Sequence, residues 1–193
     1  IETGTHNTVP IILALLAQRG IERGQVKFVI PTHVHLDHAG GVGGLMQALP
    51  EATLLVHPRG ARHMIDPSKL KAGATAVYGE EAFAKVYGDI IPVDAQRVRE
   101  MHDGAHVMVG DRRLDFYDTP GHARHHFCVY DSLSAGMFTG DTFGLSYPPL
   151  TTEKGPFILP TTTPVQFDPQ ALKASIRKLL ALNPERMFLT HYG

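Results

Sequence analysis

The sequence predicts a layered α/β domain. Strands and helices alternate along its first half, strand-like runs follow one another in its second half, and an amphipathic helix and a strand close it. No G-x-G-x-x-G segment follows a predicted strand, so a Rossmann fold is not predicted. The 193 residues are enough for a sizeable core, and we expect a single domain over 1–193.

Glycines and β-branched residues mark the elements of the first hundred positions. Gly20 ends an apolar helix, and Gly73 and Gly88 flank a second helical stretch. In order, we expect a strand end at 2–4, a helix from Asn7 or Thr8 to about Gln18, a strand at 26–30, a loop at 31–38, a short helix ending near Pro50, a strand at 53–56, a helical turn at 58–65 and a helix at 74–87. The remainder of 66–100 is expected to be an excursion over the functional site.

The second half is predicted to be rich in strands. The proline- and threonine-rich segment 143–167 is expected to be a long ordered loop. Asp168 is expected to cap the closing helix, and Asn183 and Pro184 to end it. The predicted strands are 106–109, 114–118, 127–130, 137–139 and 186–190, and the helix is 169–182.

The composition is that of an ordinary soluble protein, with 43% hydrophobic and 19% charged residues and a formal net charge of -1. It indicates neither a nucleic acid nor a membrane partner, and the longest apolar stretch, 9–17, is too short to span a bilayer. Cys128 is the single cysteine, which fits a reducing, cytoplasmic location, and its place in a predicted strand indicates a core residue. Because the chain begins at Ile1 and not at methionine, we expect a segment of a longer protein.

A cluster of histidines follows the strand predicted at 26–30. The segment T-H-V-H-L-D-H, residues 32–38, places His33, His35, Asp37 and His38 close together in the chain. In an extended loop His33 and His35 point the same way, because side chains alternate, and the other two fall at the turn into the next helix. Imidazole and carboxylate ligands suit zinc, iron or manganese, so the segment predicts a metal site.

Three more candidate ligands come where later predicted strands end. His122 closes the T-P-G-H turn at 119–122, Asp141 lies in T-G-D-T, and His191 follows the last strand. Alone, each would more often be a hydrogen-bonded turn or cap residue. Ligands at the same end of several strands would meet at one rim of a sheet, so we expect these three to join the histidine cluster.

The motif T-H-V-H-L-D-H-A-G-G at 32–41, with the three strand-end residues, closely resembles the metallo-β-lactamase-fold hydrolases, and glyoxalase II is nearest in its ligand set. The resemblance runs from the E-T-G turn at 2–4, where the family usually has D-T-G, to the end of the chain. It implies a four-layered αβ/βα sandwich, here without its first strands, and two divalent metal ions, zinc or else iron or manganese. The implied ligands are His33, His35 and His122 for the first metal, Asp37, His38 and His191 for the second, and Asp141 as the bridge.

Such a binuclear centre implies hydrolysis. A hydroxide shared by the two metals would attack an acyl carbon, and Asp37 would orient it or take its proton. Asp37 and Asp141 are therefore the catalytic candidates. His126 could orient a ligand, and Tyr147 or Tyr192 could donate a hydrogen bond to the substrate, although packing is the alternative role for both tyrosines.

The expected substrate is a small ester, thioester or lactone, and a homo-oligomer is left open. Asp141 disfavours a true β-lactamase, which usually lacks a bridging aspartate, and Gly144 disfavours an acyl-homoserine lactonase, which usually has tyrosine there. A phosphodiesterase or sulfatase stays an alternative. So does a thiol or persulfide dioxygenase with one iron at the positions of His33, His122 and Asp141. The intact ligand set argues against a third alternative, a catalytically silent metal-binding module.

Overall fold

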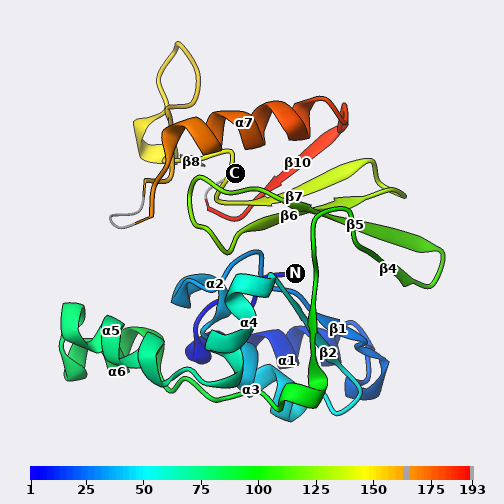
Figure 1. Cartoon of the computed structure of the whole chain (residues 1–193), viewed down its shortest axis with the longest axis vertical. Coiled ribbons are helices and arrows are strands. Elements are labelled where there is room, and N and C mark those ends of the chain that lie inside the picture. The colour runs from blue at the N-terminus through cyan, green and yellow to red at the C-terminus, as the bar shows by residue number, and fades with distance from the viewer. Residues whose placement is uncertain (163–165, 192–193) are drawn as a thin grey trace. The chain divides into compact units, whose positions relative to one another are not determined.

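The computed structural model describes residues 1–162 and 166–191. The chain divides into two compact units, residues 1–100 and residues 101–193, and each unit has its own sheet (Figure 1). Both units mix strands with helices, as the predicted α/β class requires. Within the described residues, no helix has both the length and the apolar character needed to cross a bilayer.

The first unit is built on a parallel sheet of three short strands in the order β1-β2-β3. Its strands are β1 (Phe28–Val29), β2 (Thr53–Val56) and β3 (Val98–Glu100). Its helices are α1 (Val9–Gln18), α2 (Leu36–Ala39), α3 (Val42–Ala48), α4 (Pro58–Ile65), α5 (Ser68–Tyr78) and α6 (Glu80–Tyr87), with 3-10 turns at His6–Thr8, Arg23–Gln25 and Ala95–Arg97.

The core of the first unit lies between this sheet and the helices α1, α3 and α4. Leu54 and Val56 of β2 are fully buried against Leu45 of α3 and Met64 of α4, and Val9 of α1 joins the same cluster. Burying each such side chain stabilises the fold by roughly 2 kcal/mol. This packing fixes the carboxyl end of β1, from which the histidine segment departs.

Three predictions for the first unit are wrong in detail. The helix predicted over 74–87 is two helices, because Gly79 (φ 80°, ψ 157°) cannot continue a helix, whereas Gly73 lies inside α5. The strand predicted at 26–30 pairs only at Phe28 and Val29. The loop predicted to reach residue 38 ends earlier, since α2 already begins at Leu36.

The second unit holds a five-stranded sheet in the order β10-β7-β6-β5-β4, antiparallel except for the parallel pair β10 and β7. Its strands are β4 (His106–Val109), β5 (Arg112–Asp118), β6 (Phe127–Asp131), β7 (Gly136–Gly140) and β10 (Arg186–Leu189). Helix α7 (Pro169–Leu180) covers one face of this sheet (Figure 1). Leu179 of α7 packs on Cys128 and Met137, so the core position predicted for Cys128 is confirmed.

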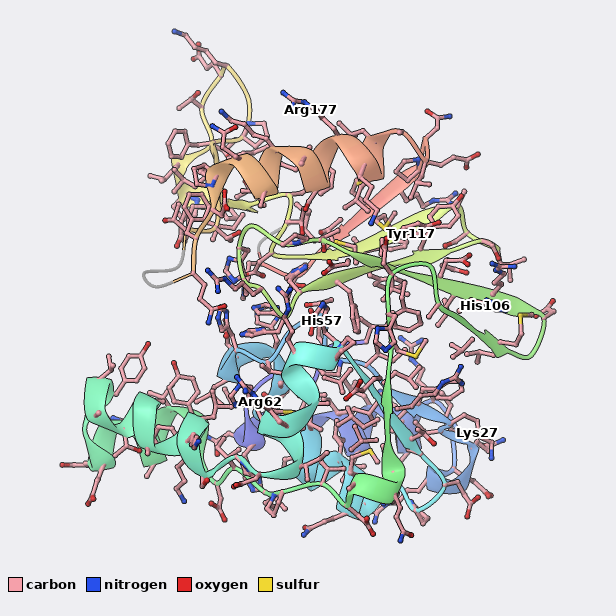
Figure 2. All side chains as sticks on the ribbon, in the orientation of Figure 1. Lys27, His57, Arg62, His106, Tyr117 and Arg177 are labelled. Atoms are coloured by element: carbon pink, nitrogen blue, oxygen red, sulfur yellow. The ribbon has the colours of Figure 1, made fainter. Side chains whose placement is uncertain are left out.

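The side chains of α7 divide between a buried and an exposed face. Lys178 lies 5.6 Å from the ring centroid of Tyr117 on β5, while Arg177 points away from the sheet (Figure 2). Asp168 caps the helix, as predicted, by accepting hydrogen bonds from the backbone N–H groups of Gln170 and Ala171 at 3.0 Å each. The segment predicted as a loop at 143–167 contains a small hairpin of β8 (Leu145–Ser146) and β9 (Ile158–Leu159). A 3-10 turn at Pro148–Leu150 lies in the loop between these two strands.

Candidate metal centre

The first unit brings His33, His35, Asp37 and His38 together. His33 and His35 lie in the segment after β1, and Nε2 of His33 is 2.8 Å from Nδ1 of His35. Asp37 and His38 lie on α2, where Nε2 of His38 is 3.4 Å from Oδ2 of Asp37. His33 and His38 are fully buried, whereas the side chain of Asp37 is 52% exposed. The segment therefore presents one imidazole pair and one imidazole–carboxylate pair.

Glu2 organises this group from the start of the chain. Its Oε1 accepts a hydrogen bond from the Thr32 hydroxyl at 2.6 Å and lies 3.1 Å from Nδ1 of His38. The Thr32 hydroxyl in turn lies 3.1 Å from Nδ1 of His33. Because that hydroxyl already donates to Glu2, it accepts the Nδ1–H of His33, and the Glu2 carboxylate accepts the Nδ1–H of His38. Both histidines are left with a lone pair on Nε2, the form that binds metals.

The backbone of Glu2 is held in an unusual conformation to do this. Its φ of 67° lies in the left-handed region, which residues other than glycine seldom occupy. The backbone N–H of Glu2 bonds to the Ile30 carbonyl at 2.9 Å, and both the N–H and the hydroxyl of Thr3 bond to the His38 carbonyl at 3.0 Å and 2.8 Å. These contacts join the E-T-G turn to β1 and α2 and compensate for the strain.

The α5–α6 hairpin packs against the short helix that carries Asp37 and His38. Leu36 of α2 is buried with Phe83 and Ile90, and Tyr87 packs against the same cluster. Burial raises the pKa of Tyr87 well above its ordinary value, and the hydrogen bond and charge of Tyr78, followed by the charge of Asp37, add to this shift. The α5–α6 hairpin therefore supports α2 within the first unit.

In the second unit, His122 is set by a turn docked on α7. Gly121 has a φ of 139°, and a Cβ added there would come within 2.6 Å of the Leu172 side chain. The Gly121 carbonyl accepts a hydrogen bond from the Asp168 N–H at 2.8 Å. Nδ1 of His122 lies 2.9 Å from the Thr161 carbonyl, which can only accept. His122 therefore carries a proton on Nδ1, so Nε2 is the ring nitrogen that could bind a metal.

Asp141 follows β7 and lies between two histidines. Its Oδ2 is 3.3 Å from Nε2 of His122, and its Oδ1 is 3.4 Å from Nε2 of His191. Its backbone N–H donates to Nε2 of His126 at 3.1 Å, and its carbonyl accepts from the Thr161 hydroxyl. One carboxylate thus faces two imidazoles, with a different oxygen toward each.

His126 has a separate part in this arrangement. Because its Nε2 accepts from Asp141, its proton is on Nδ1, which lies 2.8 Å from the Thr119 hydroxyl. The ring therefore holds the backbone of Asp141 in place and connects it to the strand end that carries the T-P-G-H turn. Tyr147 lies in the hairpin segment with 39% of its surface exposed, and Tyr192 lies outside the described residues.

Sequence reasoning missed two residues of this arrangement. Glu2 was noticed only as a departure from aspartate, and Thr161 was not singled out. Each acts through a contact with a residue far along the chain, so neither leaves a local pattern. Each of the seven predicted ligands is among the His and Asp side chains that could serve as metal ligands.

Comparison with known proteins places the chain in a family. The family model for the metallo-beta-lactamase superfamily matches residues 1–191, so the chain belongs to that superfamily, in which hydrolytic metalloenzymes predominate. This confirms the predicted membership and the mixed α/β fold class. The His and Asp groups described above are consistent with metal binding in that fold.

Three relatives illustrate the likeness. The metallo-beta-lactamase fold-containing protein ST1585 from Sulfurisphaera tokodaii is 28% identical over 88% of this chain and 61% of its own. Its crystal structure has a TM-score of 0.72, covering 86% of this chain and 62% of that one. A hydroxyacylglutathione hydrolase from Maricaulis maris is 30% identical over 58% of this chain and 31% of its own. TTHA1623 in a di-iron-bound form is 28% identical with a TM-score of 0.62, covering 94% of this chain and 76% of that chain.

The chain spans less than two thirds of the length of the curated relatives it matches, for example 61% of ST1585 and 31% of the hydroxyacylglutathione hydrolase.

Proposed function

We propose that the chain is a binuclear metal-dependent hydrolase that cleaves a small ester, thioester or lactone. The seven residues of the motif and the strand ends would divide between two metals. His33, His35 and His122 would bind one metal, Asp37, His38 and His191 the other, and Asp141 both.

The position of Asp141 is the observation that carries this proposal. Its two oxygens face Nε2 of His122 and Nε2 of His191, at 3.3 Å and 3.4 Å. A carboxylate that served one metal would need only one of these neighbours. One oxygen toward each imidazole is the arrangement expected of a bridge, and it supports two metals over one.

The donor atoms fit the proposed ions. Glu2, directly and through Thr32, and the Thr161 carbonyl place ring protons on Nδ1, so Nε2 would be the metal-binding nitrogen of His33, His38 and His122. Four of the proposed ligands, His33, His38, His122 and Asp141, are buried, which excludes water from them and strengthens their electrostatic interactions. When bound, a divalent metal in such a site lowers the pKa of water to about 7 and polarises a substrate oxygen.

The protein side chains would supply the remaining steps. Asp37 is the half-exposed carboxylate of the group, so it is placed to take a proton from the attacking water and pass it to solvent. Asp141 is buried and held by its own backbone through His126 and Thr161. It therefore suits a ligand of fixed position better than a proton carrier.

An acyl substrate is favoured over a phosphate or sulfate ester by the relatives. One of them is named a hydroxyacylglutathione hydrolase, and this points to a thioester as the first substrate to try. Hydrolysis rates for thioesters, lactones, phosphodiesters and sulfate esters, measured side by side on metal-loaded protein, would test the choice. Turnover of a phosphodiester or sulfate ester alone would contradict it.

Metal analysis tests the two-metal centre directly. We expect freshly purified protein to contain two equivalents of zinc, iron or manganese per chain, because the proposed bridge, Asp141, has one oxygen toward each of two imidazoles. The measurement is elemental analysis by mass spectrometry against protein concentration. One equivalent of iron together with oxygen consumption on a persulfide would instead establish the dioxygenase alternative.

Replacement of Glu2 tests how the histidines are set. In Glu2→Ala, the ring of His38 loses the acceptor of its Nδ1 proton, and the Thr32 hydroxyl that accepts from His33 loses the carboxylate that orients it. We therefore expect zinc affinity to fall about 10- to 100-fold. Competition with a chromophoric chelator measures this without any substrate. Glu81→Ala, an exposed carboxylate in the first turn of α6, is the matched control and should bind zinc like the wild type. Equal affinities in the two variants would disprove the role of Glu2.

A further inference from the structure

The segment between Asp141 and the closing helix carries an exposed apolar hairpin. Strands β8 and β9 pair with Leu145 opposite Leu159 and Ser146 opposite Ile158, and we call residues 145–159 the β8–β9 hairpin. Four large apolar side chains of the β8–β9 hairpin are exposed. They are Tyr147 at 39%, Leu150 at 49%, Phe157 at 48% and Ile158 at 58%.

The β8–β9 hairpin is joined at both ends to proposed metal ligands of the second unit. Asp141 lies four residues before its first strand begins. Thr161, two residues after its last strand, gives its carbonyl to Nδ1 of His122 and its hydroxyl to the Asp141 carbonyl. Thr161 is itself 7% exposed. The base of the hairpin is therefore fixed to the residues that would hold the metals.

The close approach of the two strands also indicates that the base of the β8–β9 hairpin is fixed. Gly144 has a φ of 86°, and a Cβ there would clash with the Leu159 carbonyl. Glycine at this position lets the hairpin close directly above its anchor at Thr161. Glycine is thus required at position 144, where a lactonase usually has tyrosine, because the backbone of Leu159 passes too close for a side chain.

The chemistry of the β8–β9 hairpin is almost entirely uncharged. Its charged residues are Glu153 and Lys154, which lie at the tip beside the Thr152–Gly155 bridge. Covering exposed apolar side chains with an apolar group is favourable, so this uncharged stretch suits an apolar ligand better than an ionic one.

We propose that the β8–β9 hairpin binds the acyl part of the substrate and that this acyl group is an apolar chain. Phe157 and Ile158 are the specificity-determining residues, because they are exposed and adjoin the anchored end of the hairpin. This inference rests on the proposed hydrolysis of an acyl substrate and narrows its substrate class.

A series of acyl thioesters of one thiol, from acetyl to octanoyl, tests the proposal on zinc-loaded full chain. A fully buried methylene favours binding by about fourfold, and a half-buried one by about twofold. Over six methylenes we expect kcat/KM for octanoyl to exceed that for acetyl by about 60-fold in the wild type. In Phe157→Ser and Ile158→Ser the octanoyl-to-acetyl ratio should fall by about tenfold.

Leu133→Ser is the matched control. Leu133 is 60% exposed in the turn before β7, whereas Asp141 follows β7, so the length of a strand separates it from the proposed ligand. This variant should keep the wild-type ratio. A ratio near one in the wild type, or the same ratio in all three variants, would overturn the inference while acetyl turnover still upheld the proposed hydrolysis.

Two further results would also count against it. If neither the thioesters of the series nor the corresponding esters and lactones are hydrolysed, the proposed function fails and this inference fails with it. If Phe157→Ser changes the oligomeric state in solution and leaves the ratio intact, the β8–β9 hairpin is an interface between copies of the chain. Sedimentation of each variant at the assay concentration distinguishes this case.

Discussion

Asp141→Ala should lower kcat/KM by at least about 1,000-fold and remove at least one equivalent of bound metal, because the carboxylate is proposed to bridge both ions. The fold should survive. The contacts that hold this position use the backbone N–H and carbonyl of Asp141, which alanine retains. Loss of a buried charge should leave the apo-protein at least as stable to heat as the wild type.

Two further variants test whether the effect of Asp141→Ala is specific to the charge and position of this carboxylate. Asp141→Asn keeps the size and shape of the side chain but removes its charge, so a similar loss of metal would identify charge as the requirement. Asp111→Ala, in the exposed β4–β5 turn, should behave as wild type in metal content, turnover and melting temperature. Turnover within about tenfold of wild type in Asp141→Ala would reject the bridging assignment.

The grouping of His33, His35, Asp37 and His38 could be predicted because its signals are local. His33 and His35 are two residues apart in a segment that leaves a strand, and Asp37 and His38 come at the start of α2. Alternation along an extended chain and a following helix are enough to gather such residues. The strand-end positions of His122 and Asp141 were also visible, because β5 and β7 are bounded by glycine and charged residues.

The residues that orient the ligands could not be predicted in the same way. Glu2 is 36 residues from His38, and Thr161 is 39 residues from His122, so only tertiary folding brings each pair together. Both act through ordinary residue types with many other uses. A glutamate after the first residue and a threonine in a threonine-rich loop carry no periodicity that marks them.

The prediction of element boundaries was wrong where the sequence offered two glycines as equivalent helix-ending signals. Gly73 and Gly79 both interrupt a helical pattern, yet only Gly79 has a positive φ, while Gly73 has open space around it and continues α5. The short strand β3 was not predicted, because its three residues are mostly exposed and depend on pairing with β2. Length and burial of a strand are set by its partners, which the local sequence does not identify.

Gly121→Ala should be among the most destabilising single changes in the second unit. The added Cβ would lie within 2.6 Å of the Leu172 side chain, and closer still to the backbone of the same residue, at a φ of 139°. Neither a rigid turn nor the first turn of α7 can yield at little cost, since the Gly121 carbonyl and the Asp168 N–H bond the two together. We expect a loss of at least about 3 kcal/mol in the free energy of unfolding.

Gly104→Ala separates the two causes of this loss. Gly104 also has a positive φ, 78°, but nothing lies within 4 Å of an added Cβ. Gly104→Ala should therefore lower the free energy of unfolding only through backbone strain, by about 1 kcal/mol, whereas Gly121→Ala also introduces the clash with α7. Urea unfolding of the two variants measures the difference. Equal losses would mean that the T-P-G-H turn is not packed against the helix as described. A larger loss at Gly121, accompanied by weakened zinc binding in the folded variant, would show that the position of His122 depends on α7.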